Sequence, residues 1–196
     1  MIVKIGGSVA KKLEDIFEIL AKMNDVKVIP GGWIFADLVE KLKLNDDISH
    51  WMAILGMNLY GYYMMSFAEK KGFEILEPSE FQELKQEGKF IVLPYQLLKK
   101  FDELPHSWDV TSDSIALWIA SKTGEKRVVK VTAAGGVLKD CEIANFVIAK
   151  QAVGVIDKYS PILLKNYDLE LFICSPEELK NYILRGRARG TFVRGD

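Results

Sequence analysis

The sequence predicts an α/β protein with a mainly parallel sheet whose strands are joined by crossover helices. Two observations predict this fold class. Short segments rich in Val and Ile alternate with longer stretches of helical periodicity, which is the pattern of parallel strands joined by crossover helices. Two of the short segments also end in a glycine pair that leads into a helical stretch, as strand-to-helix turns in such sheets do.

The predicted strands are short apolar runs at residues 2–5, 26–29, 73–76, 90–93, 127–131 and 169–174, with a closing edge strand at 190–194. Helical periodicity predicts helices at residues 9–23, 35–44, 48–71, 80–87, 95–101, 112–122 and 176–185. The last helix has the clearest ends, because Ser175 can cap it, Pro176 suits its first turn, Glu178 completes a capping box and Gly186 follows as a stop.

Length and composition favour a single domain over residues 1–196 that binds small molecules. At about 150 residues per domain, 196 residues make little more than one domain. Hydrophobic residues make up 49% and charged residues 27%, which is typical of a globular protein. With 26 basic and 27 acidic residues the net charge is −1, so no overall field attracts nucleic acid or an anionic membrane, and neither is expected as a partner.

Several other classes of protein are disfavoured by what the sequence lacks. Cys141 and Cys174 form no CxxC pair and only two histidines accompany them, so a zinc site is not predicted. The first apolar run is too short for a signal peptide, and we expect a cytoplasmic protein. The P-loop, GxGxxG, HExxH and GxSxG motifs are all absent.

Residues 51–68 carry no charge, and 18 residues reach the lower limit for a membrane-spanning helix. Asn58, two glycines and three tyrosines dilute this run, so a helix that is buried on most sides is the better interpretation. Its methionines and aromatic residues suit a core helix or a subunit interface, and we expect a homodimer that uses it.

The most informative feature is two glycine pairs, Gly6-Gly7, which Ser8 follows, and Gly31-Gly32. In a parallel sheet both turns lie at the carboxyl ends of strands, where ligands bind. Glycine lets the backbone approach an anion, and the N–H groups at a helix start favour it. The alternative is that both pairs only make tight turns. Lys4 lies inside an apolar strand and favours the interpretation that these turns bind phosphate groups. A lysine on an edge strand that faces solvent would also fit the pattern.

A second group of candidates follows the segment Ser107-Trp108-Asp109-Val110-Thr111-Ser112-Asp113. Thr111 can cap the helix that follows, and Asp113 in its first turn complements the helix dipole. Asp113 could equally position a lysine or meet a magnesium-bound phosphate, and the residues alone leave both open. A third turn, with Thr132, Gly135 and Gly136, could border a nucleotide or make a hairpin.

The order of these motifs resembles the amino acid kinase family over nearly the whole chain: Val-Lys-Ile-Gly-Gly-Ser, Ile-Pro-Gly-Gly, Thr-Ser-Asp-Ser, Lys-Val-Thr-Ala-Ala-Gly-Gly-Val and a late Gly-Thr. The resemblance implies an α/β fold in three αβα layers, with an open, mainly parallel sheet sandwiched between helices. It also implies transfer of the γ-phosphoryl group of ATP, with Mg²⁺, and no covalent enzyme intermediate. It implies that Lys4 is catalytic and that Asp113 orients the lysines. It also implies that the four turn glycines offer N–H groups, and that Gly6, Gly7, Ser8, Thr132, Gly135 and Gly136 border the nucleotide.

The chain departs from the family at one position. Many members carry a second catalytic lysine just after a proline, where this chain has Ile162 after Pro161. Lys158 or Lys165 could replace it, and Lys158 is the residue we expect.

The resemblance extends to the acceptor. Gly-Gly-Trp-Ile-Phe-Ala-Asp, His-Trp-Met-Ala and Ser-Trp-Asp-Val-Thr-Ser-Asp-Ser resemble the branch of the family that phosphorylates aminomethyl-furanmethanol phosphate to its diphosphate in methanofuran synthesis. The acceptor is expected at Gly31, Gly32, Trp33, Asp109 and Thr111. Trp33 could stack on a flat ring and Asp109 could receive an amine.

Alternatives remain at this stage. Other family activities, on uridylate, isopentenyl phosphate or an amino-acid carboxylate, would use the same turns, and a non-catalytic nucleotide sensor would explain the missing lysine. The arginines and glycines of residues 185–194 resemble an RNA-binding segment, but they lack the interleaved aromatic residues of a stacking platform.

Overall fold

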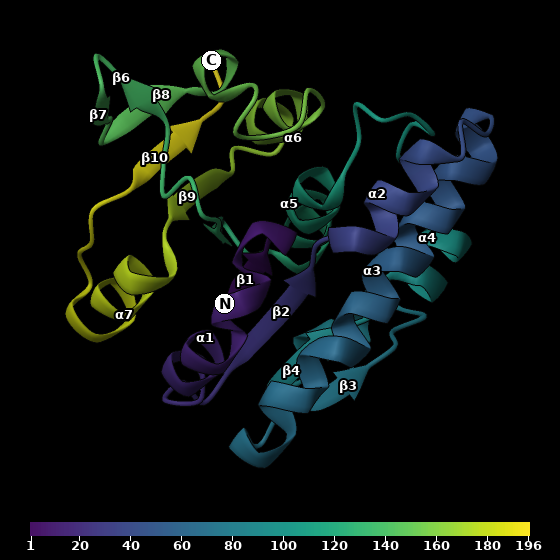
Figure 1. The fold of residues 1–196 in the computed structure, drawn as a ribbon, viewed down its shortest axis with the longest axis horizontal. Helices are drawn as coiled ribbons and strands as arrows, with labels where there is room; N and C mark the ends of the chain where they lie inside the picture. The colour runs from purple at the N-terminus through teal and green to yellow at the C-terminus, as the bar shows by residue number, and fades with distance from the viewer.

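The computed structural model describes residues 1–196 and contains an eight-stranded sheet in the order β3-β4-β2-β1-β5-β9-β10-β8 (Figure 1). All neighbouring strands run parallel except β9 and β10. The strands are β1 (Ile2–Ile5), β2 (Val26–Pro30), β3 (Glu74–Leu76), β4 (Lys89–Val92), β5 (Arg127–Val131), β8 (Phe146–Ile148), β9 (Glu170–Cys174) and β10 (Thr191–Arg194). A separate hairpin pairs β6 (Leu138–Lys139) with β7 (Glu142–Ile143). The expected open, mainly parallel sheet is confirmed.

All seven predicted strands form, each within one residue of the predicted ends. The prediction that residues 190–194 make an edge strand is wrong. β10 pairs antiparallel with β9 on one side and parallel with β8 on the other, so the unpredicted β8 forms the edge. β8 is only three residues long, and only Val147 among them is buried. Such a short segment shows too little alternation of apolar and polar residues to be predicted as a strand.

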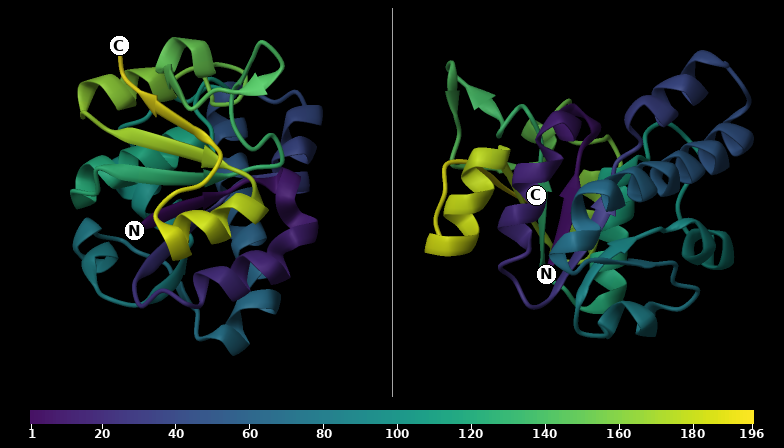
Figure 2. Two further views of the ribbon diagram at one scale, coloured as in Figure 1. Left: turned by 90° about the vertical axis from the view of Figure 1, so that its left-hand side faces the viewer. Right: turned by 60° about the horizontal axis from the view of Figure 1, so that its bottom comes forward.

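Helices cover both faces of the sheet (Figure 2). One apolar cluster joins the sheet to α1 (Leu13–Leu20), the C-terminal half of α3 (Asp46–Ala68) and α7 (Pro176–Arg185). The other joins it to α4 (Tyr95–Phe101), α5 (Ser112–Thr123) and α6 (Ser160–Asn166). The remaining helix, α2 (Trp33–Lys41), runs beside α3, and Figure 1 shows this pair at the opposite end of the molecule from the β6–β7 hairpin.

The predicted helices at 35–44, 48–71, 95–101, 112–122 and 176–185 form with modest shifts of their ends, whereas those at 9–23 and 80–87 hold only in part or fail. Residues 9–23 divide into a 3₁₀ segment, Gly7–Lys12, and α1, while residues 80–87 form only the 3₁₀ segment Phe81–Lys85. Two further 3₁₀ segments, Glu69–Lys71 and Ala149–Ala152, follow α3 and β8. The short helix α6 has no counterpart among the predictions.

Strand alternation decides which helical layer each side chain meets. Val3 and Ile5 of β1 face the α1 side, whereas Ile2 faces the α5 side, and Lys4 shares that direction because side chains two apart point the same way. In β5, Lys130 alternates in the same way with Val129 and Val131. The parallel register places Lys4 directly opposite Lys130. Two lysines therefore lie side by side beneath α5.

The uncharged run 51–68 lies within α3, and none of the helices combines the length and hydropathy needed to cross a membrane. One face of α3 packs inward through Ile54, Met57, Tyr60 and Met64. The opposite face leaves Leu59 and other large apolar side chains exposed, and together with exposed apolar residues of α2 it forms a surface, here named the α2–α3 face: Ile34, Leu38, Leu42, Ile48, Leu55, Leu59 and Tyr62.

Candidate active site

Asp113, in the first turn of α5, lies between the two strand lysines. Its Oδ1 is 2.9 Å from Nζ of Lys4, and its Oδ2 is 2.5 Å from Nζ of Lys130. All three residues are only 6% exposed. The Lys130 ammonium also donates to the backbone oxygen of Val155 at 2.6 Å. The site thus contains two buried cations and one carboxylate at the carboxyl ends of β1 and β5.

The charges of this group stabilise one another. Burial by itself raises the pKa of Asp113, but the positive charges of Lys4 and Lys130 outweigh it and hold that pKa at about 2. Burial, followed by the charge of Lys4, lowers the pKa of Lys130. The group has an excess of one positive charge in a site shielded from water, where an anion such as a phosphate is strongly favoured.

Lys130 was not among the predicted site residues. The signal was present, because Lys130 interrupts an apolar parallel strand just as Lys4 does. The expected second lysine, Lys158, is 72% exposed, and its Nζ lies 2.9 Å from Oδ1 of Asp109. The structure therefore brings Lys130, rather than Lys158, to Asp113.

Asp157 is a second carboxylate that sequence reasoning missed. Its Oδ2 accepts hydrogen bonds from the N–H and hydroxyl of Thr111 and the N–H of Ser114, at 2.8 to 3.0 Å. Its Oδ1 accepts from the Ser114 hydroxyl and from the N–H and hydroxyl of Ser160, at 2.6 to 2.8 Å. Asp157 thus ties the start of α5 to the start of α6 and fixes the position of Asp113.

The two glycine turns lie side by side at the ends of β1 and β2, but only half of their N–H groups face outward. The N–H of Gly6 donates to Val131 at 3.0 Å and that of Gly31 donates to Ile5 at 2.8 Å, so the expectation that all four glycines offer free N–H groups is wrong for these two. The sheet ladder continues into the turns and uses them. Gly7 and Gly32 begin helical segments, where the first N–H groups have no intrahelical acceptor.

Close approach explains why Gly7 cannot carry a side chain. A Cβ at Gly7 would lie 2.7 Å from Cα of Trp33, which itself has a φ of +47°. The Trp33 indole packs against the rings of Tyr60 and Tyr63, with centroids 5.0 and 4.6 Å away. Trp33 therefore joins an aromatic group behind the turns, where Tyr60 also donates to the Gly6 carbonyl at 3.4 Å.

The other predicted nucleotide residues gather on the far side of β1. The hydroxyls of Ser8 and Thr132 are 3.2 Å apart, and Ser8 Oγ accepts from the N–H of Ala133 at 3.2 Å. Gly135 and Gly136 have φ values of +68° and +157° and lead into the β6–β7 hairpin. The sequence left open whether this turn borders a nucleotide or makes a hairpin, and in the structure a hairpin follows it. Ser8, Thr132 and the glycine turn border one side of the lysine pair.

A cleft of about 540 Å³, counted with the solvent at its mouth, opens on the other side. Its walls are the start of α2, the N-terminal half of α3 and the segment from Ser107 to the first turns of α5. Gly32, Thr111 and Ser112 line it, the last two directly before Asp113 in sequence, whereas Trp33 and Asp109 do not.

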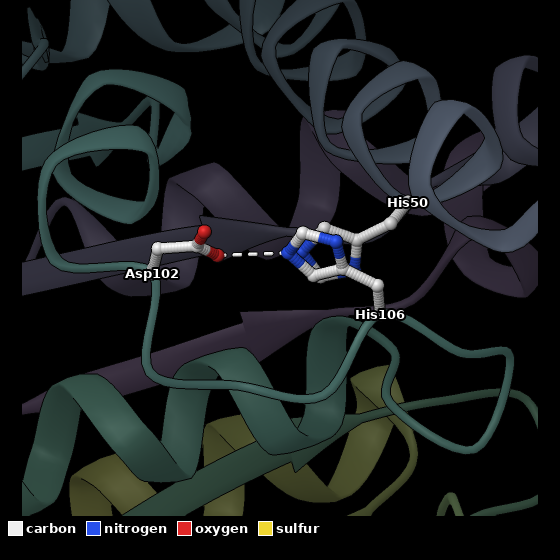
Figure 3. Close-up of side chains that lie close together, drawn as sticks. All are labelled: His50, Asp102 and His106. Atoms are coloured by element: carbon white, nitrogen blue, oxygen red, sulfur yellow. Dashed lines mark hydrogen bonds and ion pairs between the residues drawn. The ribbon is translucent and has the colours of Figure 1, made fainter.

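A histidine pair lies at the outer end of this cleft (Figure 3). The rings of His50 and His106 stack with centroids 4.1 Å apart, and the two nitrogens of His106 lie 2.7 Å from Asp47 and 2.8 Å from Asp102. Ligand atoms of His50, Asp102 and His106 are close enough together for a metal ion. However, both nitrogens of His106 face carboxylates, so in this arrangement its ring has no free lone pair for a metal.

The chain is similar to known proteins over its full length. The model of the amino acid kinase family matches residues 1–145. The [5-(aminomethyl)furan-3-yl]methyl phosphate kinase of Methanocaldococcus jannaschii is 32% identical, with 95% of this chain and 93% of that protein aligned.

Two solved structures have similar folds. The uridylate kinase of Archaeoglobus fulgidus superimposes with a TM-score of 0.72 at 17% identity, covering 98% of this chain and 99% of the other. The UMP kinase of Bacillus anthracis superimposes with a TM-score of 0.74 at 16% identity, covering 100% of this chain and 95% of the other. At these identities the two structures show the fold alone.

Proposed function

The chain belongs to the amino acid kinase family, and on this premise we propose that it transfers the γ-phosphoryl group of ATP to [5-(aminomethyl)furan-3-yl]methyl phosphate and forms the diphosphate. One observation carries the proposal. The buried group of Lys4, Asp113 and Lys130 lies between the turn of Ser8 and Thr132 and the cleft that Gly32, Thr111 and Ser112 line.

ATP is expected on the side of Ser8, Thr132, Gly135 and Gly136, with its γ-phosphate directed at the lysine pair. Mg²⁺ would neutralise charge on the phosphates and arrives bound to ATP. The protein carboxylates nearest the site do not fit a resident Mg²⁺, because both oxygens of Asp113 are paired with lysines and both oxygens of Asp157 accept hydrogen bonds.

The acceptor is expected in the cleft, with its phosphate at Gly32, Thr111 and Ser112. At the start of α5 the N–H of Ser112 has no acceptor within the protein, whereas those of Thr111, Asp113 and Ser114 are used internally, and the helix dipole favours an anion there. An oxygen of the acceptor phosphate attacks the γ-phosphorus, the bond from that phosphorus to the β-γ bridging oxygen breaks, and ADP leaves. Phosphoryl transfer depends mainly on positioning and charge stabilisation.

Each residue of the buried group has one role in this step. Lys4 and Lys130 place positive charge beside the oxygens of the transferring phosphoryl group, and Lys130 thereby fills the role of the missing second lysine. Asp113 holds both ammonium groups in place. Asp157 positions Asp113 through α5, whereas Lys158 and Asp109 form a pair at the rim of the site.

The test is a panel of acceptors incubated with MgATP and followed by phosphorus NMR for diphosphate formation. The expected result is turnover of [5-(aminomethyl)furan-3-yl]methyl phosphate, with uridylate, isopentenyl phosphate, acetylglutamate and aspartate at least a hundredfold poorer by kcat/KM. Preferential turnover of uridylate would refute the assignment of the acceptor. Absence of ATP consumption with every compound would favour a sensor.

We further propose that the protein is a homodimer, assembled through the α2–α3 face, and that it acts in the cytoplasm, where ATP and small phosphate esters are available. The exposed apolar residues of this face lie on two adjacent helices and none of them lines the cleft, and an exposed apolar surface of this kind typically marks an interface. Light scattering should give twice the 22.2 kDa chain mass. Leu59→Glu should yield monomers, and a wild-type monomer would refute the proposal.

A further inference from the structure

The two ends of the cleft differ in chemistry. The end next to Asp113 offers hydrogen-bond donors at Gly32 and Ser112, and the opposite end carries Asp46, Ser49 and His50. Apolar side chains such as Ile54 and Met57 lie between them. Asp46 and Met57 are eleven positions apart on α3, so at 1.5 Å per residue the cleft runs along about 16 Å of that helix. A ligand that fills it meets opposite chemistry at its two ends.

Asp46 is the one charged residue that lines the cleft. Its carboxylate forms no ion pair and no side-chain hydrogen bond in the structure. By contrast, the neighbouring Asp47 is paired with His106. No lysine or arginine lines the cleft, so Asp46 is free to attract a cation from a bound molecule.

His50 stands beside Asp46 with its hydrogen-bonding capacity unused. It is 7% exposed and has no hydrogen-bond partner in the protein, although its ring lines the cleft. His106 stacks on it, and the hydrogen bonds of the His106 ring to Asp102 and Asp47 raise the pKa of His106 and so favour its protonated form. Burial, followed by the charge of His106, lowers the pKa of His50 to about 4. At neutral pH the His50 imidazole is therefore uncharged and keeps a nitrogen lone pair that can accept a hydrogen bond.

We infer that Asp46 and His50 bind the ammonium group of the acceptor, at the end of the cleft opposite its phosphate. Asp46 supplies the charge and His50 a neutral hydrogen-bond acceptor. The kinase thereby selects small phosphate esters that carry an amine across a flat apolar centre. The inference rests on the proposed function for the choice of ligand.

Asp109, which the sequence suggested for this role, is the competing carboxylate. It does not line the cleft, and Lys158 already neutralises it at 2.9 Å. A cation at Asp109 would have to displace Lys158, whereas Asp46 needs no such exchange.

The test measures binding by calorimetry at pH 7.5 without ATP, so that it does not depend on turnover. The probes are [5-(aminomethyl)furan-3-yl]methyl phosphate and its analogue with a hydroxymethyl group in place of the aminomethyl group. Wild type should bind the amine at least tenfold more tightly than the analogue. Asp46→Asn should weaken binding of the amine by about 10- to 100-fold, as expected for loss of a charged hydrogen-bond partner, and leave the analogue within about twofold.

Three further variants define the comparison. His50→Phe keeps the stacked ring and should reduce the preference for the amine by about 3- to 10-fold, as expected for loss of a neutral hydrogen bond. Asp37→Asn on α2 removes a carboxylate that does not line the cleft and should preserve the preference. Asp109→Asn should also preserve it.

Three outcomes would overturn the inference. Equal affinity of wild type for both probes, equal losses for both probes in Asp46→Asn, or a preference abolished by Asp109→Asn would each do so. Turnover assays with the same variants distinguish the two proposals. Tight, amine-dependent binding without phosphorylation would refute the proposed function and support the ammonium site. Phosphorylation without a preference for the amine would support the proposed function and refute the ammonium site.

Discussion

The substitution Asp113→Asn tests the buried lysine pair most directly. At 2.9 Å and an effective dielectric constant of 20, the attraction between Asp113 and Lys4 is about 6 kcal/mol, and the pair with Lys130 is similar in size. Desolvation of three buried ions offsets most of this attraction. Removing the carboxylate nevertheless leaves two neighbouring buried ammonium groups without a counter-charge, and breaking a buried pair in this way costs about 3–5 kcal/mol.

For a chain of this length, that loss corresponds to a decrease in Tm of about 6–20 °C. In the assay, kcat/KM should fall about 100- to 1000-fold, as for removal of other groups that stabilise charge in a transition state. Thermal unfolding and kinetics should be measured at pH 7, where Asp113 is ionised because its pKa is held at about 2. Its contribution is present above the ordinary aspartate pKa of 3.8 and is lost as the pH falls toward 2.

The double variant Asp113→Asn with Lys130→Met separates stability from activity. It removes one of the two excess cations, so its Tm should recover part of the loss while kcat/KM stays low. A single Asp113→Asn variant with Tm within 2 °C and kcat/KM within about threefold of wild type would refute the reasoning.

Three other predictions follow from the same geometry. Lys130→Met should reduce kcat/KM at least about 100-fold, whereas Lys158→Met should change it less than about tenfold; the reverse order in a coupled ADP-release assay would return the second catalytic cation to Lys158. Gly7→Ala should reduce ATP affinity and Tm together, since its Cβ would lie 2.7 Å from Cα of Trp33, and unchanged values in calorimetry and thermal unfolding would contradict the tight approach. Hydrogen bonds to Asp102 and Asp47 raise the pKa of His106, so its ion pairs stabilise the fold below its ordinary pKa of 6.5 and are lost as the pH rises through the raised value. His106→Gln should therefore lower Tm by about 2–4 °C at pH 6 and by less at pH 9, and an equal loss at both pH values would show that the ring acts by packing alone.

The failures of the sequence-based predictions have local physical causes. The β6–β7 hairpin turns through Asp140 and Cys141, which have φ values of +52° and +66°. A two-residue turn with both φ values positive normally uses Asn-Gly or Asp-Gly, so this one gave no recognisable signal. The helix α6 spans only Ser160–Asn166, too short for a periodic pattern, although Pro161 in its first turn is a helix-start signal.

What the sequence by itself determined is seven strands of the main sheet, most of the long helices and the glycine turns, and it singled out Lys4 and Asp113 as candidates. These follow from burial period, turn chemistry and capping, all of which act over a few neighbouring residues. The partners of those residues were decided by the tertiary structure. Lys130 meets Asp113 because β1 and β5 pair in one register, and Asp157 meets Thr111 because α5 and α6 pack together. Such contacts join distant parts of the chain, and their geometry depends on how the sheet and helices pack as a whole.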